Sequence, residues 1–200
     1  LERKSTATTS FTWMPKCAET IVVPHGVESI QEKAFSGCSS LTSITLPDTV
    51  TSIHDKAFAG CSSLTSINIP SSVTALGNDV FSACSALTSI VLSDSVSSIG
   101  EKAFYGCSAL TSLTIPDGVK QIGRMAFGGC PSLASVSLPH DVKLRFEDTF
   151  PLKTIVTWRP QQLADFDSDA SGDVDPGEVD TFVESLTGFA SPEAKIEMAK

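Results

Sequence analysis

The chain repeats itself every 23 residues, and this period constrains its fold more than any other feature. Five cysteines keep the step, and they are Cys38, Cys61, Cys84, Cys107 and Cys130. A phenylalanine column keeps it too, at Phe35, Phe58, Phe81, Phe104, Phe127 and Phe150. Periods of this length are typical of solenoids, in which one unit cannot bury its apolar face alone. We therefore expect stacked coils around one continuous core.

One unit reads CSSLTSITLPDTVTSIHDKAFAG, and its pattern predicts the shape of a coil. Residues 43–46 alternate polar and apolar side chains, which is typical of a half-buried strand. The pair Pro47-Asp48 then predicts a turn. Val50 and Ile53 predict a second, short inward-facing stretch. Stacking would pair each strand with the next in a parallel sheet, at a spacing of about 4.8 Å.

The pattern CxxLxxIxLPxxVxxIxxxAFxG resembles the BspA-type, or Treponema pallidum-type, leucine-rich repeat over roughly residues 17–150. The resemblance implies a curved right-handed solenoid of 23-residue coils, with a parallel β-sheet on the concave face. The first unit, residues 17–37, is two residues short, and the last unit places Arg145 in the position of Ile53. Atypical terminal repeats are expected in such arrays. Residues 152–158 predict one more strand.

The cysteine column does not predict disulfides or a metal site. Cysteines one coil apart would have Cβ vectors that run parallel, so the dihedral angle of a disulfide is hard to reach. A straight row of thiols also cannot close a tetrahedron around zinc. We expect small buried apolar residues with weak hydrogen-bond donors.

Charge and composition exclude several classes of function. The formal net charge is −9 at pH 7, which argues against the electrostatic grip that nucleic-acid binding needs. No apolar run approaches the roughly 20 residues of a transmembrane segment. His25, His54 and His140 fall in turn positions, with no nucleophile at a distinctive spacing. We expect a protein that is not an enzyme and that has protein partners.

The acidic charge is concentrated in the last 42 residues. Residues 1–158 carry 11 basic and 13 acidic groups, whereas residues 159–200 carry 3 basic and 10 acidic groups. We place a domain boundary at this change of composition. The predicted division is an N-terminal segment or cap at 1–16, a leucine-rich repeat solenoid at 17–158, and a tail at 159–200.

Within the tail, the segment DSDASGDVDPGE resembles an EF-hand calcium loop, and the tail would be a small α-helical region around it. The resemblance implies that Ca²⁺ is held by oxygen atoms of Asp167, Asp169, Ser171, Asp173, Asp175 and Glu178. EF-hands normally come in pairs, and this one is single. Either the tail caps the last coil, which we favour, or a second hand comes from another chain.

The outward positions of the longer strand predict a flat, hydroxyl-rich and nearly uncharged surface. The candidate binding residues are Ser43, Thr45, Ser66, Asn68, Ser89, Val91, Ser112 and Thr114. Beside them runs a column of threonines, at Thr42, Thr65, Thr88 and Thr111. This surface lacks the aromatic and arginine anchors of tight interfaces. Ser and Thr are also simply soluble strand residues, so the columns have an ordinary structural explanation.

Three functions follow from these features. The family resemblance implies a calcium-binding protein-interaction or adhesion module that is extracellular or at a cell surface. The first alternative is a structural subunit docked in a larger complex, for example one associated with an organelle membrane or in a plastid lumen. The second alternative is a glycan- or ice-binding surface built from the Ser and Thr columns.

Overall fold

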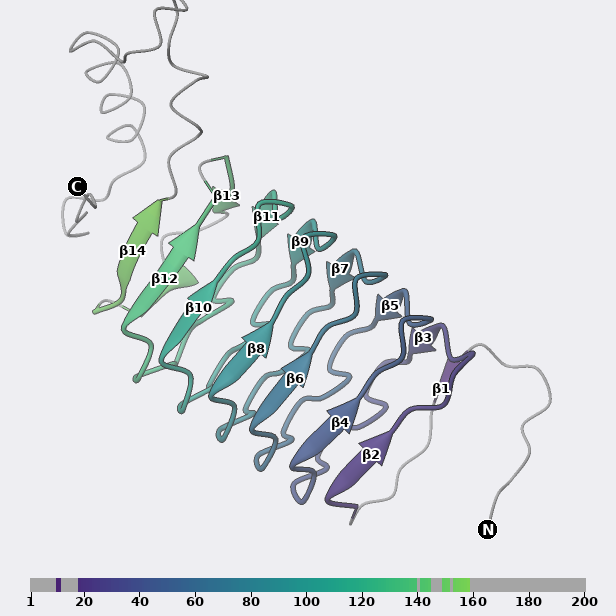
Figure 1. Ribbon diagram of the computed structural model, residues 1–200. Coiled ribbons are helices and arrows are strands. Elements are labelled where there is room, and N and C mark those ends of the chain that lie inside the picture. The colour runs from purple at the N-terminus through teal and green to yellow at the C-terminus, as the bar shows by residue number, and fades with distance from the viewer. Residues whose placement is uncertain (1–9, 12–17, 140, 145–148, 152, 159–200) are drawn as a thin grey trace, which may run out of the picture.

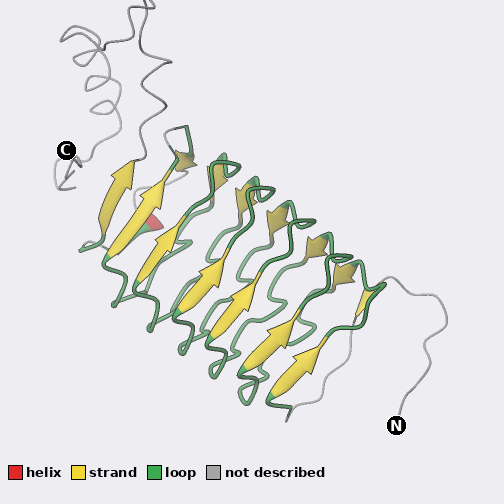
Figure 2. Cartoon of the chain, in the orientation of Figure 1, coloured by secondary structure: helices red, strands yellow, loops and turns green. Residues whose placement is uncertain are grey.

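Each 23-residue unit forms one turn of a parallel β-solenoid, and the turns lie one on the next in the order of the chain (Figures 1 and 2). This computed structural model describes residues 10–11, 18–139, 141–144, 149–151 and 153–158. Cys17, His140 and Arg145 lie outside these ranges, as does the predicted EF-hand tail, residues 159–200. The predicted coils and their parallel strands are confirmed.

One side of the solenoid carries the longer strand of each coil. These strands are β2 (Thr20–Val22), β4 (Ser43–Thr45), β6 (Ser66–Asn68), β8 (Ser89–Val91), β10 (Ser112–Thr114), β12 (Ser135–Leu138) and β14 (Ile155–Trp158). Their central residues point inward and their flanking residues outward, as the alternation predicts. β14 confirms the extra strand predicted after the last full repeat. Hydrogen-bonded ladders join β2 to β4, β6 to β8, and β10 to β12 and β14.

The second, shorter stretch of each coil forms a sheet of its own. Its seven strands are β1 (Ser10–Phe11), β3 (Ser29–Ile30), β5 (Ser52–Ile53), β7 (Ala75–Leu76), β9 (Ser98–Ile99), β11 (Gln121–Ile122) and β13 (Lys143–Leu144). This sheet runs without interruption from β1 to β13. β1 lies within the segment 1–16 and pairs with β3.

One register prediction is wrong, at the last short strand. A strict 23-residue step places Arg145 in the column of Ile53, but β11 and β13 pair Ile122 with Leu144. The step is therefore 22 residues here. The shift places Leu144, rather than Arg145, opposite Ile122 in the ladder.

The remaining part of each coil is a run of tight turns that also bonds to its neighbour. The Phe35 N–H donates to the Ala57 carbonyl at 2.8 Å, and the N–H groups of Phe58, Phe81, Phe104 and Phe127 repeat this bond. The turns need a left-handed backbone at the residue before each cysteine, where φ is +74° at Gly37 and +76° at Gly60. Ala83 takes the same position with φ +59°.

The core is built from the repeated columns, as predicted. The six phenylalanine rings form one continuous stack, with neighbouring centroids 5.2–5.6 Å apart. The five described cysteines are free and buried, and their burial confirms that they are core residues. Burial raises the pKa of the Cys107 and Cys130 thiols, so these groups stay neutral.

Candidate binding surface

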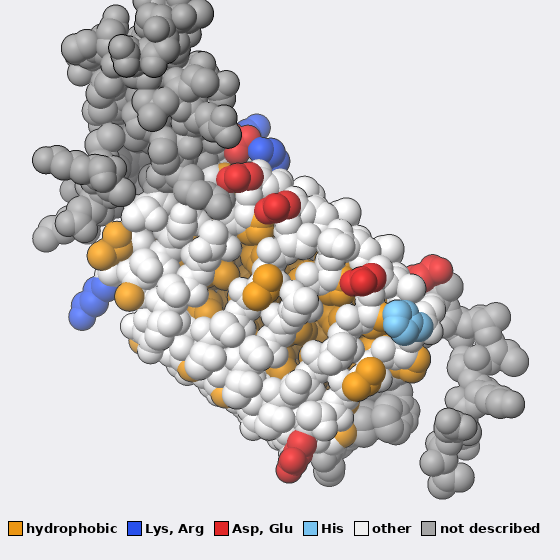
Figure 3. Space-filling view, in the orientation of Figure 1, with side chains coloured by type: hydrophobic (Ala, Val, Ile, Leu, Met, Phe, Trp, Pro, Cys, Tyr) orange, Lys and Arg blue, Asp and Glu red, His pale blue; other side chains and the backbone are white. Residues whose placement is uncertain are grey.

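The eight residues predicted as a binding surface lie together on the side of the longer strands. All eight are exposed, and they form two columns that run along β4, β6, β8 and β10. We call the outward residues of the longer strands the hydroxyl face. Figure 3 shows this face as mostly uncharged polar surface, with hydrophobic patches between the polar groups.

The hydroxyl face is larger than the predicted set of residues, which lie on β4 to β10. It also includes β2 at the N-terminal end and β12 and β14 at the C-terminal end. Val22 aligns with Thr45 through the β2–β4 register, and Ile155 aligns with Ser135 through the β12–β14 register. Val22 is 75% exposed, Val91 62% and Ile155 41%. The prediction omitted Val22 and Ile155, because the first and last units depart from the repeat pattern. The face is therefore less purely hydroxylic than expected.

The hydroxyl groups on this side divide into two kinds. Three threonines beside the face, Thr42, Thr65 and Thr88, bond to the coil before them: the Thr42 hydroxyl donates to the Glu19 carbonyl at 2.8 Å, and the Thr88 hydroxyl donates to the Thr65 carbonyl at 3.1 Å. These hydroxyls help hold the stack together. Within the described part of the chain, the side chains of the eight predicted residues make no such bond. Their hydrogen-bonding groups are therefore available to a partner.

The sheet under the face opens between β8 and β10. The Ile69 N–H donates to Val91 at 3.0 Å and the Ile115 N–H donates to Ser137 at 2.9 Å, but the Leu92 N–H has no backbone acceptor among the described residues. At the other end of the strands, the Thr111 N–H is likewise unmatched in this part of the chain. The ladder is therefore interrupted at this step.

A groove of about 390 Å³ follows this opening. Its lining residues are Thr88, Ser89, Ile90, Val91, Leu92, Asp94, Ser112, Leu113, Thr114 and Pro116. Leu92 is 9% exposed, whereas Ile115, its equivalent in the next coil, is fully buried. The groove thus gives a partner limited access to the apolar core.

The inward position after the paired outward residues is β-branched in some coils and leucine in others. Val23, Ile69 and Ile115 are β-branched there, and their N–H groups donate to the next coil. Leu46 and Leu92 stand at the same position, and the ladder is broken after each of them, whereas Leu138, also at this position, lies within the continuous β12–β14 ladder. β-branched residues favour extended backbone more strongly than leucine does. The residue type at this position therefore does not by itself decide whether the ladder opens.

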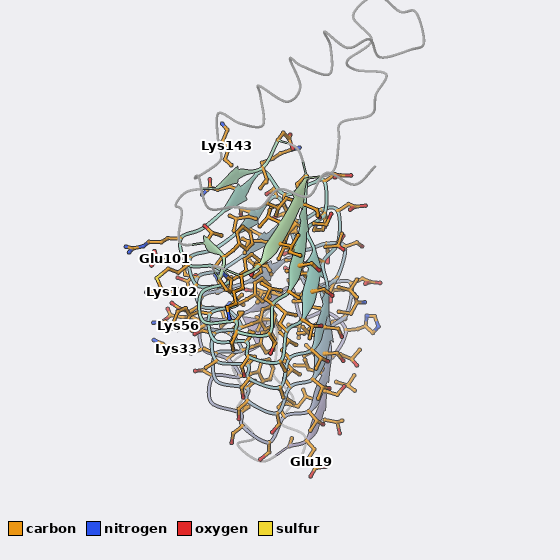
Figure 4. All side chains as sticks on the ribbon, turned by 90° about the vertical axis from the view of Figure 1, so that its left-hand side faces the viewer. Glu19, Lys33, Lys56, Glu101, Lys102 and Lys143 are labelled. Carbon is orange, nitrogen blue, oxygen red and sulfur yellow. The ribbon has the colours of Figure 1, made fainter. Side chains whose placement is uncertain are left out.

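The charges around the groove are one-sided. Asp94 is exposed at its rim and makes no ion pair with another described residue, and none of the lining residues is basic. The labelled lysines Lys33, Lys56 and Lys102 project from the turn side of the coils, away from the longer strands (Figure 4). The rim of the groove is therefore a local negative site on a nearly neutral face.

A second groove, of about 250 Å³, lies between β5 and β7 on the other sheet. Beside it, Ser29 Oγ lies 3.0 Å from His54 Nε2. Asp55, the neighbouring acid, instead accepts hydrogen bonds from the backbone and side-chain N–H groups of Asn78. The serine and histidine thus form a surface hydrogen-bond cluster without the orienting carboxylate of a catalytic triad.

Metal chemistry is not visible in the described part of the chain. No group of three or more His, Cys, Asp or Glu side chains there is arranged to hold a metal ion. The six predicted calcium ligands, from Asp167 to Glu178, lie outside the described residues. In the part of the chain that is described, no helix is long and apolar enough to cross a membrane.

Comparisons with known proteins agree with this architecture. The family model described as "BspA type Leucine rich repeat region (6 copies)" matches residues 5–134 and 77–168. Among curated proteins, none matches the chain significantly.

Among solved structures, the chain is similar to a leucine-rich repeat protein of T. pallidum, with 33% identity and a TM-score of 0.66 over 74% of this chain and 71% of that one. It is similar in fold to the pneumococcal vaccine antigen PcpA, with 17% identity and a TM-score of 0.55 over 96% of this chain and 44% of that one. The repeat columns, the coil geometry and the family match agree, and the chain belongs to the BspA-type leucine-rich repeat family.

Proposed function

We propose that this chain is a non-enzymatic protein-interaction or adhesion module that binds a protein partner through its hydroxyl face. One observation carries the proposal: the stacked strands present a nearly uncharged face on which the eight predicted residues make no side-chain hydrogen bond within the described part of the chain, and Val22 and Val91 are exposed on the same face. Exposed apolar groups set among polar ones are typical of protein-binding surfaces. Leucine-rich repeat scaffolds are commonly used as such modules.

The rigidity of the scaffold supports this function. The face rests on inward residues packed in one core, and the continuous short-strand sheet ties the coils together on the other side. Strand side chains held in this way lose little freedom when a partner binds, which favours affinity. An extracellular or cell-surface location agrees with the family resemblance. The structural-subunit and glycan- or ice-binding alternatives have no separate observation in their favour.

Photo-cross-linking tests which face binds. A photoreactive amino acid would replace Ser66 or Ser112 on the hydroxyl face, with matched controls at Thr74 and Ser97 beside the short-strand sheet. The protein would then be exposed to surface extracts of its source organism, and cross-linked partners identified by mass spectrometry. We expect the same partner from both face positions and not from the controls. Equal cross-linking from both sides would contradict the proposal.

We further propose that the tail binds one Ca²⁺ ion through the loop from Asp167 to Glu178. The support is the ligand spacing, together with Gly172 at the sharp reversal of the loop. Calorimetric titration should detect one site, and Glu178→Gln should weaken it by at least about tenfold because the bidentate ligand is lost. Glu184→Gln, outside the loop, is the control and should bind normally. An absence of calcium binding in the wild-type chain would refute the site.

A further inference from the structure

We propose that the groove between β8 and β10 is the anchor point of the hydroxyl face, and that its occupant is an extended basic segment of a partner protein. An apolar side chain of this segment would enter the groove, and a lysine or arginine would lie beside Asp94. This inference rests on the proposed function and adds the chemistry of the partner.

The groove has the features of a recognition site for an extended peptide. Its floor includes Leu92, which is partly accessible, and its rim includes Val91, which is well exposed. The unmatched N–H groups of Leu92 and Thr111 lie at the two ends of the opening. A backbone donor near an apolar surface is costly to leave unpaired, and peptide carbonyls could accept hydrogen bonds from these groups. Apolar contact and backbone hydrogen bonds would thus act together.

Charge complementarity selects a basic segment. Asp94 is the charged residue of the groove lining, and no described residue neutralises it by an ion pair. In an extended peptide, residues two or three apart are separated by about 7–10 Å, so an apolar anchor and a cation at that spacing can reach the groove and its rim.

The same charges disfavour two other occupants. The tail of this chain, residues 159–200, carries 10 acidic and 3 basic groups. A second copy of the chain carries a net charge of −9 and the same acidic rim. Either would bring like charge toward Asp94, which opposes association. A basic segment of a different protein would instead be attracted by the negative charge of Asp94.

The test uses a defined probe, the peptide acetyl-Thr-Val-Leu-Thr-Lys-Thr-amide, titrated into the ¹⁵N-labelled full chain and followed by NMR. We expect shifts of the amides of Val91, Leu92, Asp94 and Thr114, with few elsewhere. A peptide with glutamate in place of lysine should bind about tenfold more weakly. Equal affinity of the two peptides, shifts spread over the whole face, or no binding would overturn the proposal.

Matched variants separate the contribution of the Asp94 charge to binding from that of the groove itself. Asp94→Asn should lower the affinity about threefold, which is the scale of an exposed charge pair, while Asp79→Asn on the turn side should not change it. Thr114→Tyr should block the groove, and Ser137→Tyr, one coil further in the same column, should not. If Thr114→Tyr binds the peptide normally, the groove is not the site.

Two outcomes distinguish this inference from the proposed function. If the peptide fails to bind but cross-linking from Ser66 and Ser112 still captures one partner, the hydroxyl face is correct and the groove proposal is wrong. Sedimentation of the full chain tests whether a second copy of the chain occupies the groove. A dimer that Thr114→Tyr dissociates would show that a second copy fills the groove, and that result too would overturn the proposal.

Discussion

The Sγ atom of Cys84 lies 3.2 Å from the carbonyl oxygen of Phe58, so the cysteine column and the phenylalanine column of successive coils are joined by hydrogen bonds. The same bond links Cys61 to Phe35 and Cys130 to Phe104. In each pair the thiol donates to the coil before its own. The cysteine therefore both fills space in the core and connects neighbouring coils.

The buried thiols predict a loss of stability in alkali. The pKa values of Cys61, Cys107 and Cys130 are raised: for Cys61 mainly by a hydrogen bond with Cys84, and for the other two mainly by burial. A thiol in the unfolded chain has a pKa near 8.5. Above that pH the unfolded chain loses protons that the folded chain keeps. The free energy of unfolding should therefore be constant below about pH 8 and should fall above it by about 1.4 kcal/mol per pH unit for each such thiol.

Denaturant titrations at pH 7 to 10 measure this loss. Cys107→Ala should be less stable at pH 7, because it leaves a small cavity, but its stability should fall less steeply above pH 8.5. Ser108→Ala is a half-buried control in the same turn that removes no thiol, and it should keep the wild-type slope. Identical slopes for Cys107→Ala and the wild-type chain would show that the thiols are not responsible.

Ala83 predicts a stabilising substitution. It holds φ +59° at the position where Gly37, Gly60, Gly106 and Gly129 stand in the other coils. An L-residue in this conformation is strained by about 1 kcal/mol relative to glycine. Ala83→Gly should thus raise the free energy of unfolding by about that amount, whereas Ala86→Gly, where φ is not positive, should lower it. Thermal or denaturant unfolding checks both, and destabilisation by Ala83→Gly would contradict the assignment.

The phenylalanine stack predicts a large core effect. Phe81 is fully buried between Phe58 and Phe104, with ring centroids 5.3 and 5.6 Å away. Phe81→Ala should lower the free energy of unfolding by about 3–5 kcal/mol. Tyr105→Ala removes an aromatic ring that is 38% exposed and should have a much smaller effect. Comparable losses in the two variants would mean that the stack is not the centre of the core.

The interruption after Leu92 allows a test of whether the side chain at this position affects backbone hydrogen bonding. Leu92→Ile should favour the extended backbone at this position, so the amide of residue 92 should bond to the next coil and exchange more slowly. The reverse change, Ile69→Leu, should speed exchange at residue 69. Hydrogen exchange followed by NMR measures both amides. Unchanged protection in both variants would show that the side chain does not control the opening.

The repeat made much of the fold predictable. A column of buried side chains needs one residue type at one spacing, so Cys84, Phe81 and their equivalents could be assigned to the core before the coils were seen. The outward positions of the hydroxyl face, such as Ser66 and Thr114, follow from the period-2 alternation of a strand. The first and last coils were less predictable, because Val22 and Leu144 lie where the pattern changes.

The groove could not be predicted from the 23-residue step. It lies where the hydrogen-bonded ladder is interrupted between β8 and β10, and no departure from the repeat pattern marks this step. It also depends on which hydroxyls bond within the stack. Thr88 and Ser89 are adjacent and similar in sequence, but only Thr88 donates to the previous coil among the described residues. Which of these hydroxyls bonds within the stack therefore depends on where the backbone places each residue, and not on the residue type.

The central claim is that the hydroxyl face binds a protein partner, and the dissociation constant of the cross-linked partner tests it most directly. The double variant Ser66→Lys and Ser112→Lys places two positive charges on the face. Thr74→Lys with Ser97→Lys places the same charges beside the short-strand sheet. We predict at least about a tenfold weaker complex for the face variant and an unchanged one for the control, because added bulk and the desolvation of two lysine charges on a binding surface oppose association. Equal dissociation constants for the two double variants would contradict the account.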